Sequence, residues 1–94
     1  MPQFEFFGNL KVYGNCKKCK SRIENRLQNV NGIYSASWDQ QSQILGVHYE
    51  HALITMNEII QILLSIGHDT EAYKADQSTY ESLPKTCHYR IINT

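Results

Sequence analysis

The feature that most constrains this fold is the order in which two hydrophobic periodicities alternate along the chain. Residues 4–12 carry apolar side chains largely at every second position, which is typical of a strand. Residues 19–30 carry them at every third or fourth position, which is typical of a helix facing a core. Residues 33–39 and 44–50 return to strand-like alternation on either side of a short polar turn, and so predict a hairpin.

The second half of the chain repeats the change from helix to strand. Residues 55–58, "TMNE", form a capping box before an apolar stretch, with Thr55 at the helix start and Glu58 three positions later. This motif predicts a second helix, which we expect to end at Gly67. Residues 68–73 then predict a short fourth strand.

The resulting order, βαββαβ, has a preferred packing. We expect an α+β, ferredoxin-like βαββαβ sandwich, in which a four-stranded antiparallel sheet carries two helices on one face and exposes the other. The 94 residues suffice for one compact core. We place the domain at residues 1–75 and expect residues 76–94 to form a C-terminal extension with a short helix and a tail.

The three cysteines are the strongest functional signal. The stretch "YGNCKKCKSRIENRL" places Cys16 in the loop after the first strand and Cys19 in the first helical turn, whereas Cys87 lies far away. An odd number of cysteines argues against a disulfide framework. The helix N-terminus and the neighbouring lysines favour thiolate over thiol at both positions of the pair. We expect neither of these two thiols to be needed for the core.

This cysteine pair fits some functions better than others. A structural zinc site needs four ligands, and no second C-x-x-C or histidine pair at metal spacing follows. A thioredoxin-like site commonly has an aromatic residue before the pair, whereas Asn15 stands here. Two soft sulfur ligands suit Cu(I) best and also admit Zn(II), Hg(II) or another thiophilic ion. A thiol–disulfide redox protein is the alternative; no nucleophile–base pair is apparent, and we do not expect an enzyme.

Several short stretches together resemble the heavy-metal-associated domain family, which includes copper chaperones, metal-binding modules of copper-transporting P-type ATPases and mercury-binding proteins. The resemblance covers roughly residues 9–73 and rests on "VYGNCKKCKSRIE", on "NGI" at residues 31–33, on the alternation of Leu45, Val47 and Tyr49, and on "SIGHDTEAY". The family usually has Gly-Met-x-Cys at the start of the pair, whereas this chain has Gly-Asn-Cys.

The resemblance implies that Cys16 and Cys19 are the metal ligands and that the metal passes between proteins by ligand exchange at an exposed loop. The implied function is that of a metallochaperone or of a metal-binding module in a transport system. Its donor or acceptor would be a P-type ATPase or an efflux component. We expect a monomer in the cytoplasm, because the start of the chain shows no export signal.

Two further residues are candidate metal ligands. His68 follows Gly67 at a turn that this fold places beside the cysteine loop, so it is either a surface residue that shields the site or a weak third ligand and pH-sensitive neighbour. Cys87 follows Lys74 by 13 residues, and such a segment spans up to about 40 Å, enough to return to the site as a third sulfur. The alternative for Cys87 is a free thiol on a tail.

The charge is unevenly distributed, although the formal net charge is zero. Six basic residues lie within residues 11–26, namely Lys11, Lys17, Lys18, Lys20, Arg22 and Arg26. This cluster either solvates a helix face or docks an acidic surface on a partner protein. It is local and not interleaved with aromatic residues, so we expect no nucleic-acid ligand. No apolar run approaches the ~20 residues that membrane insertion requires.

Overall fold

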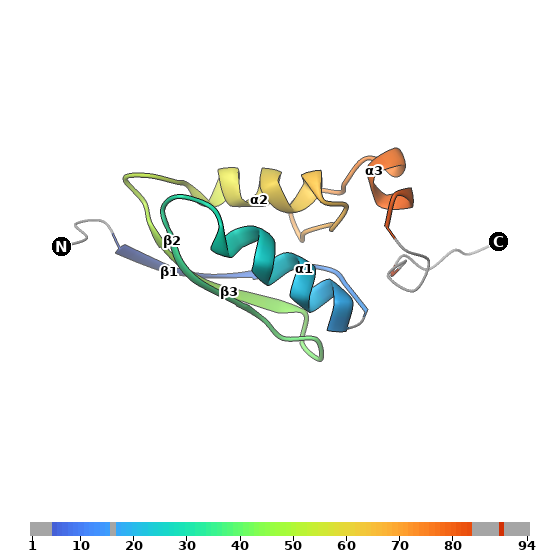
Figure 1. Cartoon of the computed structure of the whole chain (residues 1–94), viewed down its shortest axis with the longest axis horizontal. Helices are drawn as coiled ribbons and strands as arrows, with labels where there is room; N and C mark the ends of the chain where they lie inside the picture. Colours follow the sequence, from blue (N-terminus) through green and yellow to red (C-terminus); the bar gives the residue numbers. More distant parts are fainter. Residues whose placement is uncertain (1–4, 16, 84–88, 90–94) are drawn as a thin grey trace.

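The computed structural model describes residues 5–15, 17–83 and 89. Its elements are β1 (Glu5–Lys11), α1 (Lys17–Gln28), β2 (Ile33–Trp38), β3 (Ile44–Glu50), α2 (Met56–Ser65) and α3 (Gln77–Glu81). The strands form one antiparallel sheet in the order β1-β3-β2. Figure 1 shows α1 and α2 together over one face of this sheet, with α3 beyond the C-terminal end of α2. This is the predicted α+β arrangement of helices on an antiparallel sheet.

Each long helix forms for reasons that are visible in its sequence. α1 buries Cys19, Ile23 and Leu27, which recur every four residues and therefore share one face. α2 begins at the predicted capping box: the Thr55 hydroxyl accepts the Glu58 N–H at 3.2 Å, and the Glu58 carboxylate accepts the Thr55 N–H at 3.3 Å. The core lies between these helices and the helix-facing side of the sheet.

The predicted fourth strand does not form, so the prediction of a four-stranded sheet is wrong for the part of the chain that the structure describes. The segment after α2 meets the continuation of β1 at an isolated antiparallel bridge between Val12 and Thr70. Beside this bridge, the Glu71 N–H donates to the Lys11 carbonyl at 3.0 Å. The segment therefore touches the edge of β1 at its C-terminal end without extending the sheet.

A tight turn at residues 70–73 ends this pairing. The Thr70 N–H donates to the Tyr73 carbonyl at 2.8 Å, and the Thr70 hydroxyl accepts the Tyr73 N–H at 3.1 Å. The Glu71 carboxylate accepts the Lys11 N–H at 3.0 Å, where a longer strand would present a backbone carbonyl. Local side-chain bonds of this kind compete with the ladder of a sheet, and here they turn the chain away from β1.

Among the helices of the described residues, none combines the length and the apolar character that crossing a membrane demands.

Candidate metal centre

Cys19 lies in the first turn of α1, at the end of the sheet where β1 leads into the helix. Its side chain has 0% of its surface exposed and belongs to the hydrophobic core. The expectation that neither thiol of the pair contributes to the core is therefore wrong for Cys19, because its position on α1 already faces the sheet. Cys16 lies outside the described residues, and its role as a metal ligand stays a prediction.

The loop before α1 passes close to Cys19. A Cβ atom on Gly14 would lie 3.0 Å from the Cβ atom of Cys19 and 3.0 Å from the Trp38 ring. Contacts this short would force Cys19 or Trp38 to shift by a few tenths of an ångström, so glycine favours the close approach. The Trp38 indole N–H donates to the Val12 carbonyl at 2.8 Å and fixes the start of the same loop. The core thus determines the path of the backbone toward the cysteine pair.

Two polar side chains reach the sulfur of Cys19. The thiol donates to Asn15 Oδ1 at 3.4 Å, and Arg22 Nη1 lies 4.0 Å from Sγ. Arg22 follows Cys19 by three positions on α1, so both side chains lie on the same side of the helix. A guanidinium keeps its positive charge at all ordinary pH values, and it favours negative charge on the sulfur.

The lysines around the pair divide into two groups. Lys17 and Lys18 are exposed at the start of α1. The Lys20 ammonium instead donates to the Glu24 carboxylate at 2.6 Å and to the Trp38 carbonyl at 2.8 Å, and so ties α1 to β2. Lys17 and Lys18 are therefore exposed to solvent at the cysteine end of α1, whereas Lys20 is held against β2.

His68 is the most constrained polar side chain near this loop. Its Nδ1 atom lies 2.9 Å from the Tyr13 carbonyl, and its Nε2 atom lies 3.2 Å from Arg22 Nη1. A carbonyl only accepts and a guanidinium only donates, so the ring carries its proton on Nδ1 and accepts with Nε2. Burial lowers the pKa of His68 below its ordinary value of 6.5, and the charge of Arg22 lowers it further against the opposing effect of the Tyr13 carbonyl. The imidazole is therefore neutral at pH 7.

The structure corrects one of the two expectations for His68. The residue is not on the surface, because none of its area is exposed to solvent. Its role as a third ligand or pH-sensitive neighbour stays a prediction. Both ring nitrogens are engaged here, so coordination through Nε2 would require Arg22 to move.

Tyr89 brings the C-terminal extension to this end of the molecule. Its ring stacks on His68 with 5.5 Å between ring centroids and an interplanar angle of 13°. Its hydroxyl donates to the Gly67 carbonyl at 2.7 Å and accepts the Asp69 N–H at 2.6 Å. Cys87 lies outside the described residues, and its role as a third sulfur ligand stays a prediction.

Sequence reasoning does not place two of the residues that lie beside Cys19 and His68. The sequence assigns Arg22 only to the basic cluster, although its spacing of three from Cys19 on a helix is a usable signal. Tyr89 lies far from the pair in sequence, and no local pattern places it beside His68.

Among the residues that the structure describes, no group of three or more His, Cys, Asp or Glu side chains is arranged to hold a metal ion.

A family model and several solved structures match this chain. The sequence profile of the heavy-metal-associated domain matches residues 15–69. The solved structure of the CopZ metallochaperone superimposes with a TM-score of 0.67 at 26% identity, over 69% of this chain and 98% of that one. A copper binding domain from HMA7, a P-type ATPase, gives a TM-score of 0.66 at 26% identity, over 69% of this chain and 89% of that one.

A third relative shows the fold alone. Oxidized MerP from Ralstonia metallidurans CH34 superimposes with a TM-score of 0.67 at 15% identity, over 71% of this chain and 94% of that one. No curated protein sequence gives a significant match.

Proposed function

Since this chain belongs to the heavy-metal-associated domain family, we propose that it binds a soft metal ion, Cu(I) before others, and passes that ion to a partner protein. The observation that carries the proposal is the position of the Cys19 sulfur, in the first turn of α1 with the Arg22 guanidinium 4.0 Å away. A helix N-terminus and a fixed cation both stabilise thiolate, which is the form that binds metal. Cys16, three positions earlier, supplies the second sulfur.

The proposed chemistry is ligand exchange without oxidation or reduction. Cys16 and Cys19 each lose a proton and hold the ion between two sulfur atoms. A thiolate of the acceptor adds to the ion as one of the two original sulfurs leaves, and a second acceptor thiolate then replaces the other original sulfur. Two sulfur ligands satisfy Cu(I) and also Hg(II), whereas Zn(II) prefers four ligands and would need donors from elsewhere.

The partner is proposed to present an acidic docking surface. Lys17 and Lys18 are exposed at the metal end, and Arg26 is exposed farther along α1. A metal donor or acceptor with matching carboxylates would be steered toward this end of the helix. A P-type ATPase or an efflux component is the proposed partner, because a similar solved structure is a copper binding domain of a P-type ATPase. We place the exchange in the cytoplasm, where thiols stay reduced, and between monomers.

The decisive experiment is a Cu(I) titration against a competing chelator. Cys16→Ser and Cys19→Ser should each abolish tight binding, and Cys87→Ser, measured beside them, shows the effect of losing the third thiol alone. Cys19 is buried, so the fold of Cys19→Ser must be checked by thermal unfolding before its binding is interpreted. Wild-type affinity in a folded variant that lacks either Cys16 or Cys19 would refute the assignment.

The same samples address the redox alternative and the remaining ligands. Disulfide reductase activity in the absence of Cu(I) binding would favour a redox protein. X-ray absorption on the copper-loaded chain counts its sulfur and nitrogen ligands. If Cys87→Ala leaves the sulfur count unchanged and His68→Gln leaves the nitrogen count unchanged, neither residue is a ligand.

Salt dependence tests the docking surface. Transfer of Cu(I) to an acidic acceptor should slow as ionic strength rises, because screening shortens the field to about 8 Å at physiological salt. Lys18→Gln should reduce the rate at low salt, because it removes an exposed charge at the start of α1. A transfer rate that is independent of salt would show that the lysines only solubilise the helix.

A further inference from the structure

One cation stands between the proposed metal ligand and a buried neutral histidine. We propose that Arg22 is a positioning residue that determines ion specificity, because its charge makes the cysteine pair favour monovalent over divalent thiophilic ions. This inference rests on the proposed function, since it concerns the same site. It goes further by naming the charge class of the ion and the side chain that selects it.

The geometry places a single nitrogen of Arg22 within reach of both neighbours. Nη1 lies 4.0 Å from Cys19 Sγ and 3.2 Å from His68 Nε2. This nitrogen carries two hydrogens, so it can direct one toward the sulfur and one toward the imidazole. The guanidinium therefore holds its charge beside one of the two sulfur atoms to which the ion would bind.

His68 is built to hold the guanidinium in this place. The Tyr13 carbonyl fixes the Nδ1–H tautomer at 2.9 Å, which leaves the lone pair of Nε2 aimed at Arg22. The Tyr89 ring stacks on the His68 ring, and its hydroxyl donates to the Gly67 carbonyl at 2.7 Å. A free arginine side chain samples many rotamers, so a buried acceptor that is itself anchored limits where the charge can go.

Charge counting shows which ions this arrangement favours. Two thiolates and a monovalent ion form a unit with a net charge of −1, whereas two thiolates and a divalent ion form a neutral unit. A nearby positive charge attracts the first unit and has little net interaction with the second. The Arg22 charge should therefore raise the affinity for Cu(I) or Ag(I) much more than the affinity for Hg(II), although all three accept linear coordination by two sulfurs.

The test compares two ions in the full-length chain. Affinities for Cu(I) and Hg(II) are measured by competition in wild-type protein, Arg22→Gln and Arg22→Lys, with folding verified by circular dichroism. Arg22→Gln should lose ~10–100-fold in Cu(I) affinity, the range for residues that support metal ligands, and change much less toward Hg(II). Arg22→Lys keeps the charge and should recover most of the loss.

Two controls separate charge selection from a structural effect. Arg26→Gln removes an exposed charge one turn away on α1 and should leave both affinities unchanged. His68→Gln should shift the ratio of the two affinities in the same direction as Arg22→Gln, by a smaller factor. An equal loss for both ions, or an unchanged Cu(I) to Hg(II) ratio in folded Arg22→Gln, would overturn the inference. Absence of cysteine-dependent Cu(I) binding in the wild-type chain would instead overturn the proposed function.

Discussion

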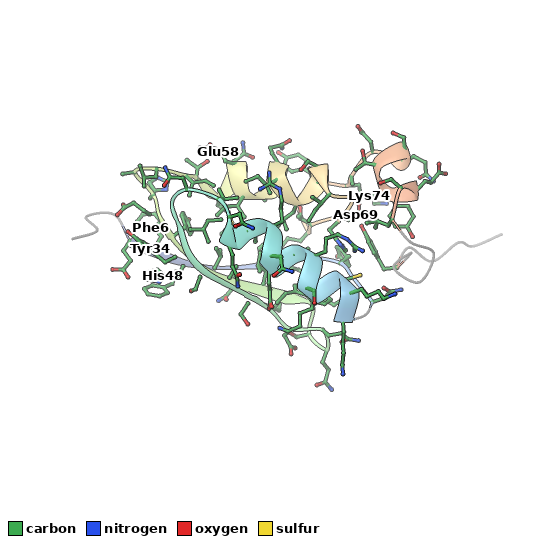
Figure 2. All side chains as sticks on the ribbon, in the orientation of Figure 1. Phe6, Tyr34, His48, Glu58, Asp69 and Lys74 are labelled. Atoms are coloured by element: carbon green, nitrogen blue, oxygen red, sulfur yellow. The ribbon has the colours of Figure 1, made fainter. Side chains whose placement is uncertain are left out.

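The two ends of the sheet each carry a histidine, and the two rings lie in opposite environments. His68, at the cysteine end, is fully buried with both nitrogens hydrogen-bonded. His48, at the other end, lies on the open face of the sheet, stacked on Phe7 with 4.1 Å between centroids and tilted against Tyr34 at 4.7 Å. Figure 2 shows His48 and Tyr34 together at the end of the sheet opposite Asp69. The Glu5 carboxylate is the ion-pair partner of His48.

The two ends are stabilised by different kinds of interaction, buried hydrogen bonds at one and exposed ring stacking at the other. At the cysteine end, the buried polar residues His68, Asp69 and Thr70 make directional hydrogen bonds to backbone groups, so the geometry is closely specified. At the other end, exposed rings stack on one another, and such contacts tolerate small shifts. A site that must hold an ion in fixed geometry gains from the first arrangement.

The largest expected effect comes from removing an aromatic ring at each end. Trp38→Ala should lower the free energy of unfolding by ~3–5 kcal/mol, because its side chain is fully buried and its indole bonds to the Val12 carbonyl. Phe7→Ala should cost about 1 kcal/mol at most, because the ring is 77% exposed and stacks on His48. Urea denaturation measures both. Similar losses at the two ends would contradict the comparison.

A smaller effect is expected from single hydrogen-bonding carboxylates. Asp69→Ala should cost ~1–3 kcal/mol, because its buried Oδ1 atom accepts the Ala75 N–H at 2.8 Å and the change removes this buried hydrogen bond. Glu58→Ala, at the exposed start of α2, should cost about 0.5–1 kcal/mol through loss of the capping box. Glu58→Gln, which keeps an acceptor oxygen, is the matched control. If Glu58→Ala proves the more damaging change, the two ends are not distinguished by burial.

The pH dependence of stability should follow His68. Its pKa in the folded chain is lowered by burial below the ordinary value of 6.5, so below about pH 6.5 the unfolded chain binds more protons than the folded one. The free energy of unfolding should therefore fall as the pH drops below about 6.5, and the contribution of His68 should be fully present well above that pH. His68→Gln should reduce this slope. Parallel slopes for the wild type and His68→Gln would rule out His68 as the cause.

The sequence predicts some of these features well, for identifiable reasons. The helix faces and the capping box of α2 depend on residues within one or two turns of each other, so periodicity and spacing reveal them. The Cys19 position follows in the same way from the start of α1. The links among Tyr13, His68 and Tyr89 join distant segments through a backbone carbonyl and a ring stack, and no local pattern encodes them.

The fourth strand shows the limit of alternation as a signal. "HDTEAY" has the composition of a short strand, but Thr70 is bonded to residue 73 and turns the chain before a ladder can form. A sequence pattern gives the side chains' tendency to alternate, whereas the choice between a ladder and a turn depends on which hydrogen bonds the neighbouring strand offers.

The smallest expected effect concerns the contact that replaces this strand. The Glu71 carboxylate accepts the Lys11 N–H at 3.0 Å at the cysteine end of β1. Glu71→Ala should expose this amide and speed its hydrogen exchange, while the unfolding midpoint in urea stays within error, because the contact is exposed to solvent. Glu71→Gln keeps an acceptor oxygen and should preserve the protection.

The same strand provides the control at its other end. Glu5→Ala removes the ion-pair partner of His48 and should leave the Lys11 amide unaffected, because its contact is made on the open face of the sheet. The hydrogen-exchange rate of the Lys11 amide is measured by NMR in both variants. If the Lys11 amide is equally protected in wild type and Glu71→Ala, a backbone carbonyl must be accepting it. A genuine fourth strand would then complete the sheet in solution, and the turn at Thr70 would not be what ends the pairing.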